Sequence, residues 1–397
     1  MNLQSLLDAF KKDPRLFQLA DKLSFARPQR IHCENLRGSA ASFVISTIFQ
    51  NPASSQLNHL VVCEDAEKAA YLHNSLENLT NALNLYFFPS SFKNRKNFRL
   101  LNPSHVMLRT EALTRFAAQS QGRAGMLITY PEALFEKVVL PNTLSGNIIY
   151  IKSGDTLDLV GLMDKLVGYG FERTDFVYEP GQFALRGGIL DIYSFGNEKP
   201  YRVELFGNDV DSIRIFDPET QLSERKLLQV TIIPNVDTQF DTSDKISLFD
   251  FLPENTVVWM QDWSFTKERL IIQEEDLELF LTTVTPIQKA RDAAGDEDTR
   301  MEKTDTKPED FVPALRLEQQ LQSRHIVAFG HGKDFPEGDP AAHDIPVDIH
   351  FNTKAQPAFN RQFDLLIRDL KSWSTKDFGL YLFAENPRQL ERLNSIF

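Results

Sequence analysis

Strand-like and helix-like patterns alternate over the first 150 residues of the chain. Short strand-like runs are each followed by a turn or an amphipathic stretch, and they lie at residues 30–33, 60–63, 84–88, 125–129 and 147–152. Parallel strands need long crossover connections, which are usually helices, so this alternation is typical of a parallel sheet covered by helices. The sequence therefore predicts an α/β domain.

A different pattern begins after a predicted helix at residues 157–168. Residues 171–235 contain short strands joined by turns, which indicates a small antiparallel α+β domain. The polar segment 288–310 is predicted to be a linker, and residues 379–397 to form a strand and a helix that is capped by Asn386. We expect four segments: the first part of the α/β domain at 1–150, an inserted domain at 151–236, a return to the α/β domain at 237–350, and the truncated beginning of a further α/β domain at 351–397.

A small-residue loop lies between the first strand-like run and an apolar helical run. Its sequence, LRGSAAS at 36–42, stands where nucleotide-binding proteins hold phosphate. A functional loop follows the pattern GxxxxGK[ST]. If Gly38 is the first glycine, Phe43 and Val44 occupy the positions of the second glycine and of the lysine. We expect no ATP binding here, and an ordinary strand-to-helix turn explains the loop residues Gly38, Ser39, Ala40, Ala41 and Ser42.

Charge and cysteine content exclude several classes of protein. The formal net charge of -12 argues against this chain alone gripping a nucleic-acid backbone. No apolar run approaches the roughly 18 residues that a membrane span needs. Cys33 and Cys63 lie in apolar runs, which indicates buried thiols and a cytoplasmic location. No metal-ligand or catalytic constellation is visible, so we expect no metal and no cofactor.

Side-chain alternation divides the small domain's sheet into two faces. Val203 and Leu205 point one way, while Arg202, Glu204 and Phe206 point the other. The second face also receives, from the neighbouring strands, Asp191, Tyr193, Arg214 and Phe216. A solvated face with cross-strand ion pairs explains this composition. A protein-binding surface with exposed arginine and aromatic residues explains it too.

Two long segments resemble a known family. The run GQFALRGGILDIYSFGNEKPYRVELFGNDVDSIRIFDPETQ at 181–221 closely resembles the second domain of the bacterial transcription-repair coupling factor (Mfd) family, and more distantly that of the excision-repair helicase UvrB. The run LFDFLPENTVVWMQD at 248–262 resembles the helix, turn and strand that follow in both families. The resemblance covers residues 15–275 well and 350–397 more loosely.

This resemblance implies a degenerate P-loop domain of the RecA-like, helicase type. The loop at 36–42 resembles the decayed phosphate loop of the coupling factors, whereas UvrB has an intact one. Where UvrB carries the acidic D-E-x-H of a helicase, this chain has Gln261-Asp262-Trp263-Ser264. The resemblance therefore implies that this chain is not an enzyme, although the full-length family is an ATP-dependent DNA translocase. A UvrB-like ATP-dependent DNA helicase module is the alternative.

The same resemblance implies an adaptor in transcription-coupled nucleotide excision repair. Such a module recruits UvrA to RNA polymerase that is stalled at DNA damage, while the polymerase and DNA are contacted through domains absent from this chain. Carried over by position, the UvrA-contacting residues are Arg186, Arg202 and Phe206, and Glu204 and Arg214 share their face.

Overall fold

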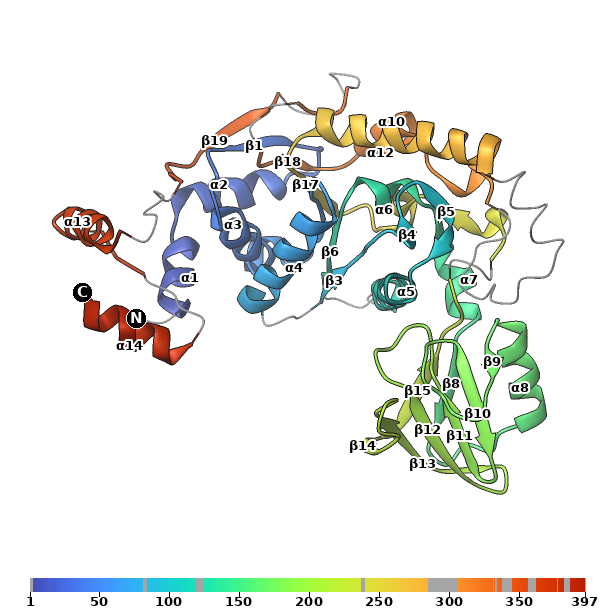
Figure 1. Cartoon of the computed structure of the whole chain (residues 1–397). Helices are drawn as coiled ribbons and strands as arrows, with labels where there is room; N and C mark the ends of the chain where they lie inside the picture. Colours follow the sequence, from blue (N-terminus) through green and yellow to red (C-terminus); the bar gives the residue numbers. More distant parts are fainter. Residues whose placement is uncertain are drawn as a thin grey trace.

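A seven-stranded parallel sheet forms the body of the protein (Figure 1). The computed structural model describes residues 3–80, 84–118, 124–236, 240–284, 306–330, 332, 334–337, 345–355, 362–376, 378–381 and 386–396. In sheet order the strands are β19 (Val347–His350), β1 (Arg30–Glu34), β18 (Ile326–Ala328), β17 (Thr256–Met260), β2 (Asn58–Val62), β6 (Met126–Thr129) and β3 (Leu85–Phe87). Each neighbouring pair is parallel.

Helices cover both faces of this sheet, as a parallel sheet requires. In Figure 1, α3 (Ala40–Phe49) and α4 (Ala66–Thr80) lie on one side, and α10 (Trp263–Leu279) and α12 (Ala314–Leu321) lie on the other. The central strands β2 and β17 are buried along their whole length. The predicted α/β fold with a parallel sheet is therefore confirmed.

The sheet is completed by strands that are far apart in the sequence. β17, β18 and β19 come after residue 255, and they pair with strands from the first 62 residues. In the sequence, the smaller domain lies between these two parts of the chain. In Figure 1 it lies to one side of the parallel sheet. The four predicted segment boundaries stay a prediction.

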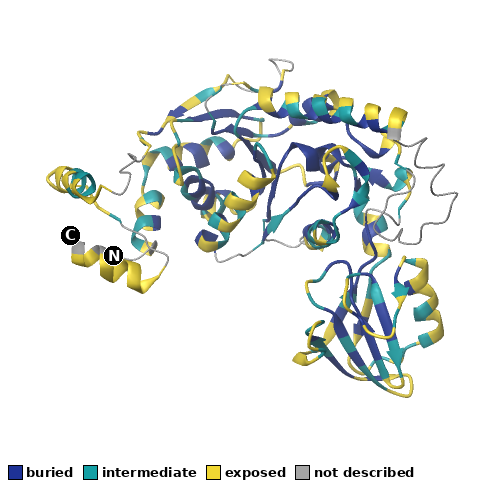
Figure 2. Cartoon of the chain, in the orientation of Figure 1, coloured by how far each residue is buried: buried dark blue, intermediate teal, exposed yellow. Residues whose placement is uncertain are grey.

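The smaller domain contains a six-stranded, mostly antiparallel sheet. Its order is β14 (Ser223–Leu227), β13 (Asp209–Phe216), β12 (Tyr201–Phe206), β11 (Ile189–Ile192), β10 (Gln182–Arg186) and β9 (Glu172–Arg173), of which only β9 and β10 pair in parallel. One face of this sheet belongs to the main hydrophobic core. The same core includes Leu166 of α8 (Leu159–Gly168) and residues of the antiparallel pair β8 (Ile149–Lys152) and β15 (Gln229–Ile232). Figure 2 shows the strands largely buried and α8 exposed on its outer side. The predicted small α+β domain is thus present.

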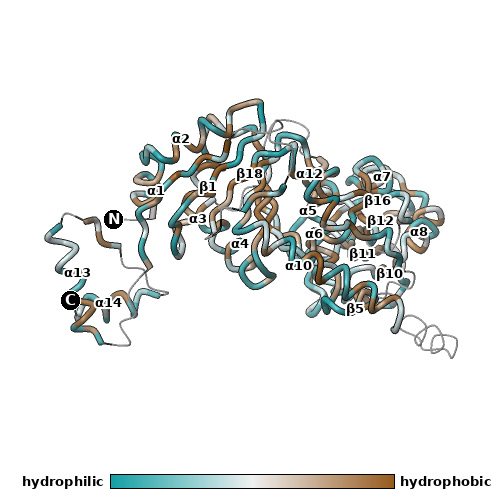
Figure 3. The backbone as a smooth tube through the Cα atoms, turned by 90° about the horizontal axis from the view of Figure 1, so that it is seen from above, coloured by the Kyte–Doolittle hydropathy of each residue, from teal (hydrophilic) through white to brown (hydrophobic). Residues whose placement is uncertain are grey.

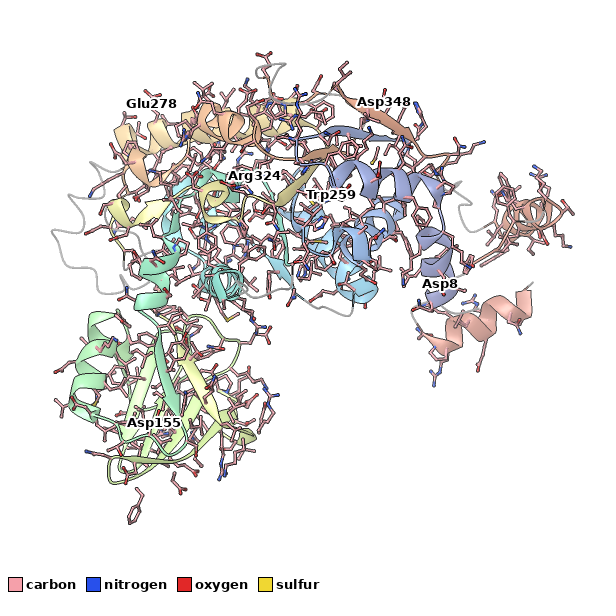
Figure 4. All side chains as sticks on the ribbon, turned by 180° about the vertical axis from the view of Figure 1, so that it is seen from behind. Asp8, Asp155, Trp259, Glu278, Arg324 and Asp348 are labelled. Carbon is pink, nitrogen blue, oxygen red and sulfur yellow. The ribbon has the colours of Figure 1, made fainter. Side chains whose placement is uncertain are left out.

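A buried hydrogen bond joins two central strands of the parallel sheet. The indole N–H of Trp259, on β17, donates to Nδ1 of His59, on β2, over 2.8 Å. Trp259 lies near the middle of the molecule in Figure 4. Burial lowers the pKa of His59 to about 3, so the imidazole is neutral and can accept this bond. Hydropathy patterns alone gave no sign of this pairing.

Two helices near the C-terminus stand apart from the sheet. Figures 1 and 3 both place α13 (Phe363–Ser374) and α14 (Pro387–Ile396) away from the body, and no residue of α13 is buried. The predicted cap is confirmed, because Oδ1 of Asn386 accepts from the backbone N–H of Gln389 over 3.0 Å. The predicted strand is not formed at residues 378–381, and its remaining residues are outside the described part of the chain.

Two other points concern the described residues only. Of the polar segment 288–310 that is predicted to be a linker, residues 288–305 lie outside the described part of the chain. Within the described part of the chain, no helix combines the length and the apolar character that crossing a bilayer would need.

Candidate docking surface

Two rows of side chains cross the polar face of the small domain's sheet. Directly opposed residues of an antiparallel pair point to the same face. The register therefore places in one row Ala184, Asp191, Arg202, Arg214 and Lys226. The next row consists of Arg186, Ile189, Glu204 and Ser212. The structure thus brings the arginines and the glutamate named from the sequence onto one face.

Asp191 is the buried centre of this face. Its side chain is fully buried, and Arg202 donates to both of its carboxylate oxygens, over 2.8 and 2.9 Å. Arg186 donates to Oδ2 of the same carboxylate over 2.6 Å. A carboxylate removed from water needs such charge-assisted bonds, because an unpaired buried charge is strongly destabilising. The two arginines therefore supply the charge-assisted hydrogen bonds that this buried carboxylate needs.

Arg202 is occupied by the fold. Its side chain is only 14% exposed, and Nη1 also donates to the backbone carbonyl of Gln221 over 2.9 Å. The guanidinium carbon lies 4.3 Å from the ring centroid of Phe216. The hydrogen bonds to Asp191 raise the pKa of Arg202 above its ordinary value. The geometry gives Arg202 a bracing role, with little surface left for a partner.

A short segment, residues 174–180, covers part of the polar face; we call it the strap. Nη1 of Arg186 donates to the carbonyl of Asp175 over 2.8 Å, and the side-chain amide of Gln221 donates to the carbonyl of Val177 over 3.1 Å. Val177 is buried in a small apolar cluster that also contains Ala184, Tyr193 and Phe216. The expectation that Tyr193 and Phe216 are exposed aromatic residues is therefore wrong. Alternation predicted their side of the sheet but not the strap above it.

The open end of the polar face contains an exposed phenylalanine. Phe206 ends β12 and is 84% exposed. Gly207 follows it with φ of 64°, and Gly187 follows Arg186 with φ of 58°; both lie in the left-handed region that favours glycine. Strands β10 and β12 run in the same direction, since each is antiparallel to β11 between them. Phe206 and Arg186 therefore lie at the same end of the sheet.

Charged and aromatic side chains lie on the same face as Phe206. Glu204 accepts a hydrogen bond from Ser212 and lies 3.4 Å from the guanidinium of Arg214. Arg186 packs its guanidinium carbon 4.3 Å from the ring centroid of Phe176, an exposed residue of the strap that the sequence analysis missed. We define the docking surface by its residues, which are Phe176, Arg186, Glu204, Phe206 and Arg214.

The loop at 36–42 lines a separate cavity on the parallel sheet. This cavity of about 450 Å³ is bounded by residues that include Arg37, Gly38 and Ala41 and, on other elements, Gln261 and Asp262. The structure thus places the loop at 36–42 and the pair Gln261 and Asp262, which are far apart in the sequence, at one cavity. Asp262 caps α10 by accepting from the backbone N–H of Phe265, and Lys68 in the lining is paired with Glu64. These groups are therefore engaged in contacts within the chain.

Comparison with known proteins finds a sequence match over the whole small domain. The sequence model of the UvrB interaction domain matches residues 149–238, which include the whole six-stranded sheet. A transcription-repair-coupling factor of Staphylococcus aureus RF122 is 30% identical over 195 residues, which are 49% of this chain and 16% of that protein. The chain is homologous to the N-terminal region of transcription-repair-coupling factors.

Two further relatives extend the comparison. The transcription-repair-coupling factor of S. aureus USA300 is 24% identical over 403 residues, covering 90% of this chain and 34% of that protein. The one from Escherichia coli K12 is 25% identical over 199 residues, covering 50% of this chain and 17% of that protein. The chain therefore spans about a third or less of the length of these curated relatives.

The different burial of Arg202 and Phe206 predicts different effects on stability. Arg202→Ala leaves Asp191 buried with one arginine instead of two, so we expect a loss of about 2–4 kcal/mol in the free energy of unfolding. Phe206→Ala removes an exposed side chain and should change this free energy by less than about 0.5 kcal/mol. Urea unfolding followed by circular dichroism measures both. Equal effects of the two substitutions would contradict the bracing role of Arg202.

Proposed function

We propose that this chain is the adaptor module of a transcription-repair coupling factor and recruits UvrA in nucleotide excision repair of transcription-blocking lesions. The observation that carries the proposal is the exposed Phe206 at the same end of the sheet as Arg186, within the residues that match the UvrB interaction domain. RNA polymerase and DNA would be contacted by parts of the longer relatives beyond the region that this chain matches.

The docking surface has the features of an energetic hot spot. Phe206 is a large apolar side chain that can be buried only by a partner, and arginine and aromatic residues dominate binding energy at protein interfaces. Arg186 is held by the carbonyl of Asp175, by Asp191 and by the ring of Phe176. Because its rotamer is already fixed, little side-chain entropy is lost when a partner binds. Arg202 acts in this account as a positioning residue that holds Asp191 and Gln221.

We also propose that the parallel-sheet domain is a degenerate helicase-type domain without ATPase activity. Phe43 and Val44 stand where a phosphate loop has glycine and lysine, so the loop lacks the charge and the close backbone approach that phosphates need. Gln261 cannot bind Mg²⁺ as a carboxylate would.

A cytoplasmic location fits the chemistry of the two thiols. Cys33 and Cys63 are free and buried, and burial raises the pKa of each to about 12. Thiols of this kind are inert and suit a reducing compartment.

Removing the Phe206 ring should weaken UvrA binding without unfolding the protein. We expect Phe206→Ala to raise the dissociation constant for UvrA from the same organism at least tenfold, because a hot-spot residue is worth about 2 kcal/mol or more. Tyr150→Ala is the matched control: it removes an exposed aromatic ring of the same domain, on the separate β8–β15 pair, and should have no effect. Isothermal titration calorimetry measures both. Unchanged binding by Phe206→Ala, or no binding by the unchanged chain, would refute the proposal.

The lost phosphate loop predicts the absence of nucleotide binding. Calorimetric titration of the chain with Mg-ATP should show no binding with a dissociation constant below about 1 mM, which corresponds to a binding free energy of roughly −4 kcal/mol. UvrB from the same organism, titrated under the same conditions, serves as the positive control. Binding tighter than about 1 mM would favour the helicase alternative over the adaptor.

A further inference from the structure

Two segments that cover the polar face are fastened to each other. One is the strap, and the other is the turn at residues 217–222. The side-chain amide of Gln221 donates to the backbone carbonyl of Val177 in the strap, over 3.1 Å, and to that of Pro218 in its own turn, over 2.7 Å. These bonds join the two segments into one unit, which we call the roof.

The backbone of Gln221 has an unusual conformation. Its φ of 60° lies in the left-handed region, where the other described residues with positive φ are glycine or asparagine. Both of these adopt the left-handed region more readily than glutamine does. A glycine would relieve the strain, but it would lack the amide that reaches the strap. Strained backbone is concentrated at functional sites, which favours a function for the roof beyond covering the sheet.

The outer side of the roof exposes large apolar side chains. Tyr178 and Leu222 are both exposed, and they follow directly in sequence the bonded residues Val177 and Gln221. The exposed Phe176, a member of the docking surface, lies on the same strap. The charged residues of the roof are all acidic, and they are Asp175, Glu179, Asp217 and Glu219. The roof therefore offers a partner apolar contacts and no basic group.

The strap connects the docking surface with the opposite end of the sheet. Arg186 ends β10 on the side of Phe206, and it binds the carbonyl of Asp175. Gln182, at the other end of β10, accepts a hydrogen bond from the backbone N–H of Tyr178 over 2.9 Å. The roof is thus a continuation of the docking surface along the sheet.

The docking surface is too small to be a complete interface. A standard interface between two proteins involves about 20–30 residues on each side, far more than the docking surface contains. The contact can extend over the roof or over the edge strand β14. The strand is polar, with the sequence SERKL, whereas the roof is apolar and held in place by hydrogen bonds. Aromatic anchors contribute most to binding energy, so extension over the roof is favoured.

We propose that the roof is the second part of this interface, where Tyr178 and Leu222 bind an apolar patch on the partner. The inference rests on the proposed function, since it takes the partner to be UvrA, and it adds the chemistry of the partner's surface. Because Gln221 already holds the roof in place, little order has to be gained on binding. A nucleic-acid backbone suits the roof poorly, because binding phosphates needs basic side chains.

A purely structural role of the roof is the other explanation. Exposed apolar side chains are common on protein surfaces and need no partner. The roof would then serve only to bury the small cluster of Val177, Ala184, Tyr193 and Phe216. In that case, removing its outer side chains would leave UvrA binding unchanged.

Two matched double variants distinguish these explanations. Tyr178→Ala combined with Leu222→Ala removes the outer side chains of the roof, which are 54% and 69% exposed. The control combines Tyr150→Ala on β8 with Leu228→Ala, which lies at the other end of β14 from Leu222; these side chains are 56% and 83% exposed. Both pairs therefore lose the same exposed groups from the same domain.

The roof variant should raise the dissociation constant for UvrA about tenfold or more, because each lost contact residue of an interface core weakens binding several-fold. The control variant should change it by less than about twofold. Isothermal titration calorimetry measures both constants. The melting temperatures of both variants should stay close to that of the unchanged chain, since substitutions of exposed side chains have small effects on stability.

Each result has a definite meaning. If the roof variant binds UvrA as tightly as the unchanged chain, the inference is wrong, while loss of binding by Phe206→Ala still supports the proposed function. If the control variant is weakened as much as the roof variant, the roof is not the preferred extension and the inference is overturned. If the unchanged chain does not bind UvrA, the proposed function and the inference both fail. If the roof variant loses affinity only for a short DNA duplex, the roof is a nucleic-acid site and the inference is also overturned.

Discussion

One buried carboxylate, Asp191, determines the arrangement of the small domain's polar face. A carboxylate without access to water must be paired and hydrogen-bonded, and two arginines satisfy this requirement from the strands on either side. Those arginines also bind backbone carbonyls of two covering segments: Arg186 binds the strap at Asp175, and Arg202 binds the turn at Gln221. The constraint on one acidic side chain therefore fixes both loops above the sheet.

In this arrangement, one arginine stabilises the fold while other side chains are exposed to a partner. Arg202 is nearly enclosed, whereas Phe206 extends into solvent and Arg186 lies between them in exposure. A rigid, half-buried arginine at the same end of the sheet as an exposed aromatic ring is suited to protein recognition, because little order has to be gained when a partner binds. The parallel sheet provides a large core to which this small domain is attached, and the loop at 36–42 lines a separate cavity on that sheet.

Sequence patterns predicted the parts of the fold that depend on local periodicity. The alternation of strands and helices predicted the parallel sheet, and alternation within strands placed Arg202, Glu204 and Phe206 on one face. Non-local contacts could not be predicted in this way: the cover over Tyr193 and Phe216 comes from the strap, and the bond between His59 and Trp259 joins strands about 200 residues apart. The roles of the docking residues stay a prediction.

Hydrogen–deuterium exchange of the chain, alone and with UvrA, tests the docking account most directly, because it reports which backbone amides a partner protects. The account predicts slower exchange on UvrA binding in the strap, residues 174–180, and around the turn after Phe206, with no change in α8 on the opposite face. Protection confined to α8 or to the loop at 36–42, with unchanged exchange at the strap and the Phe206 turn, would contradict it.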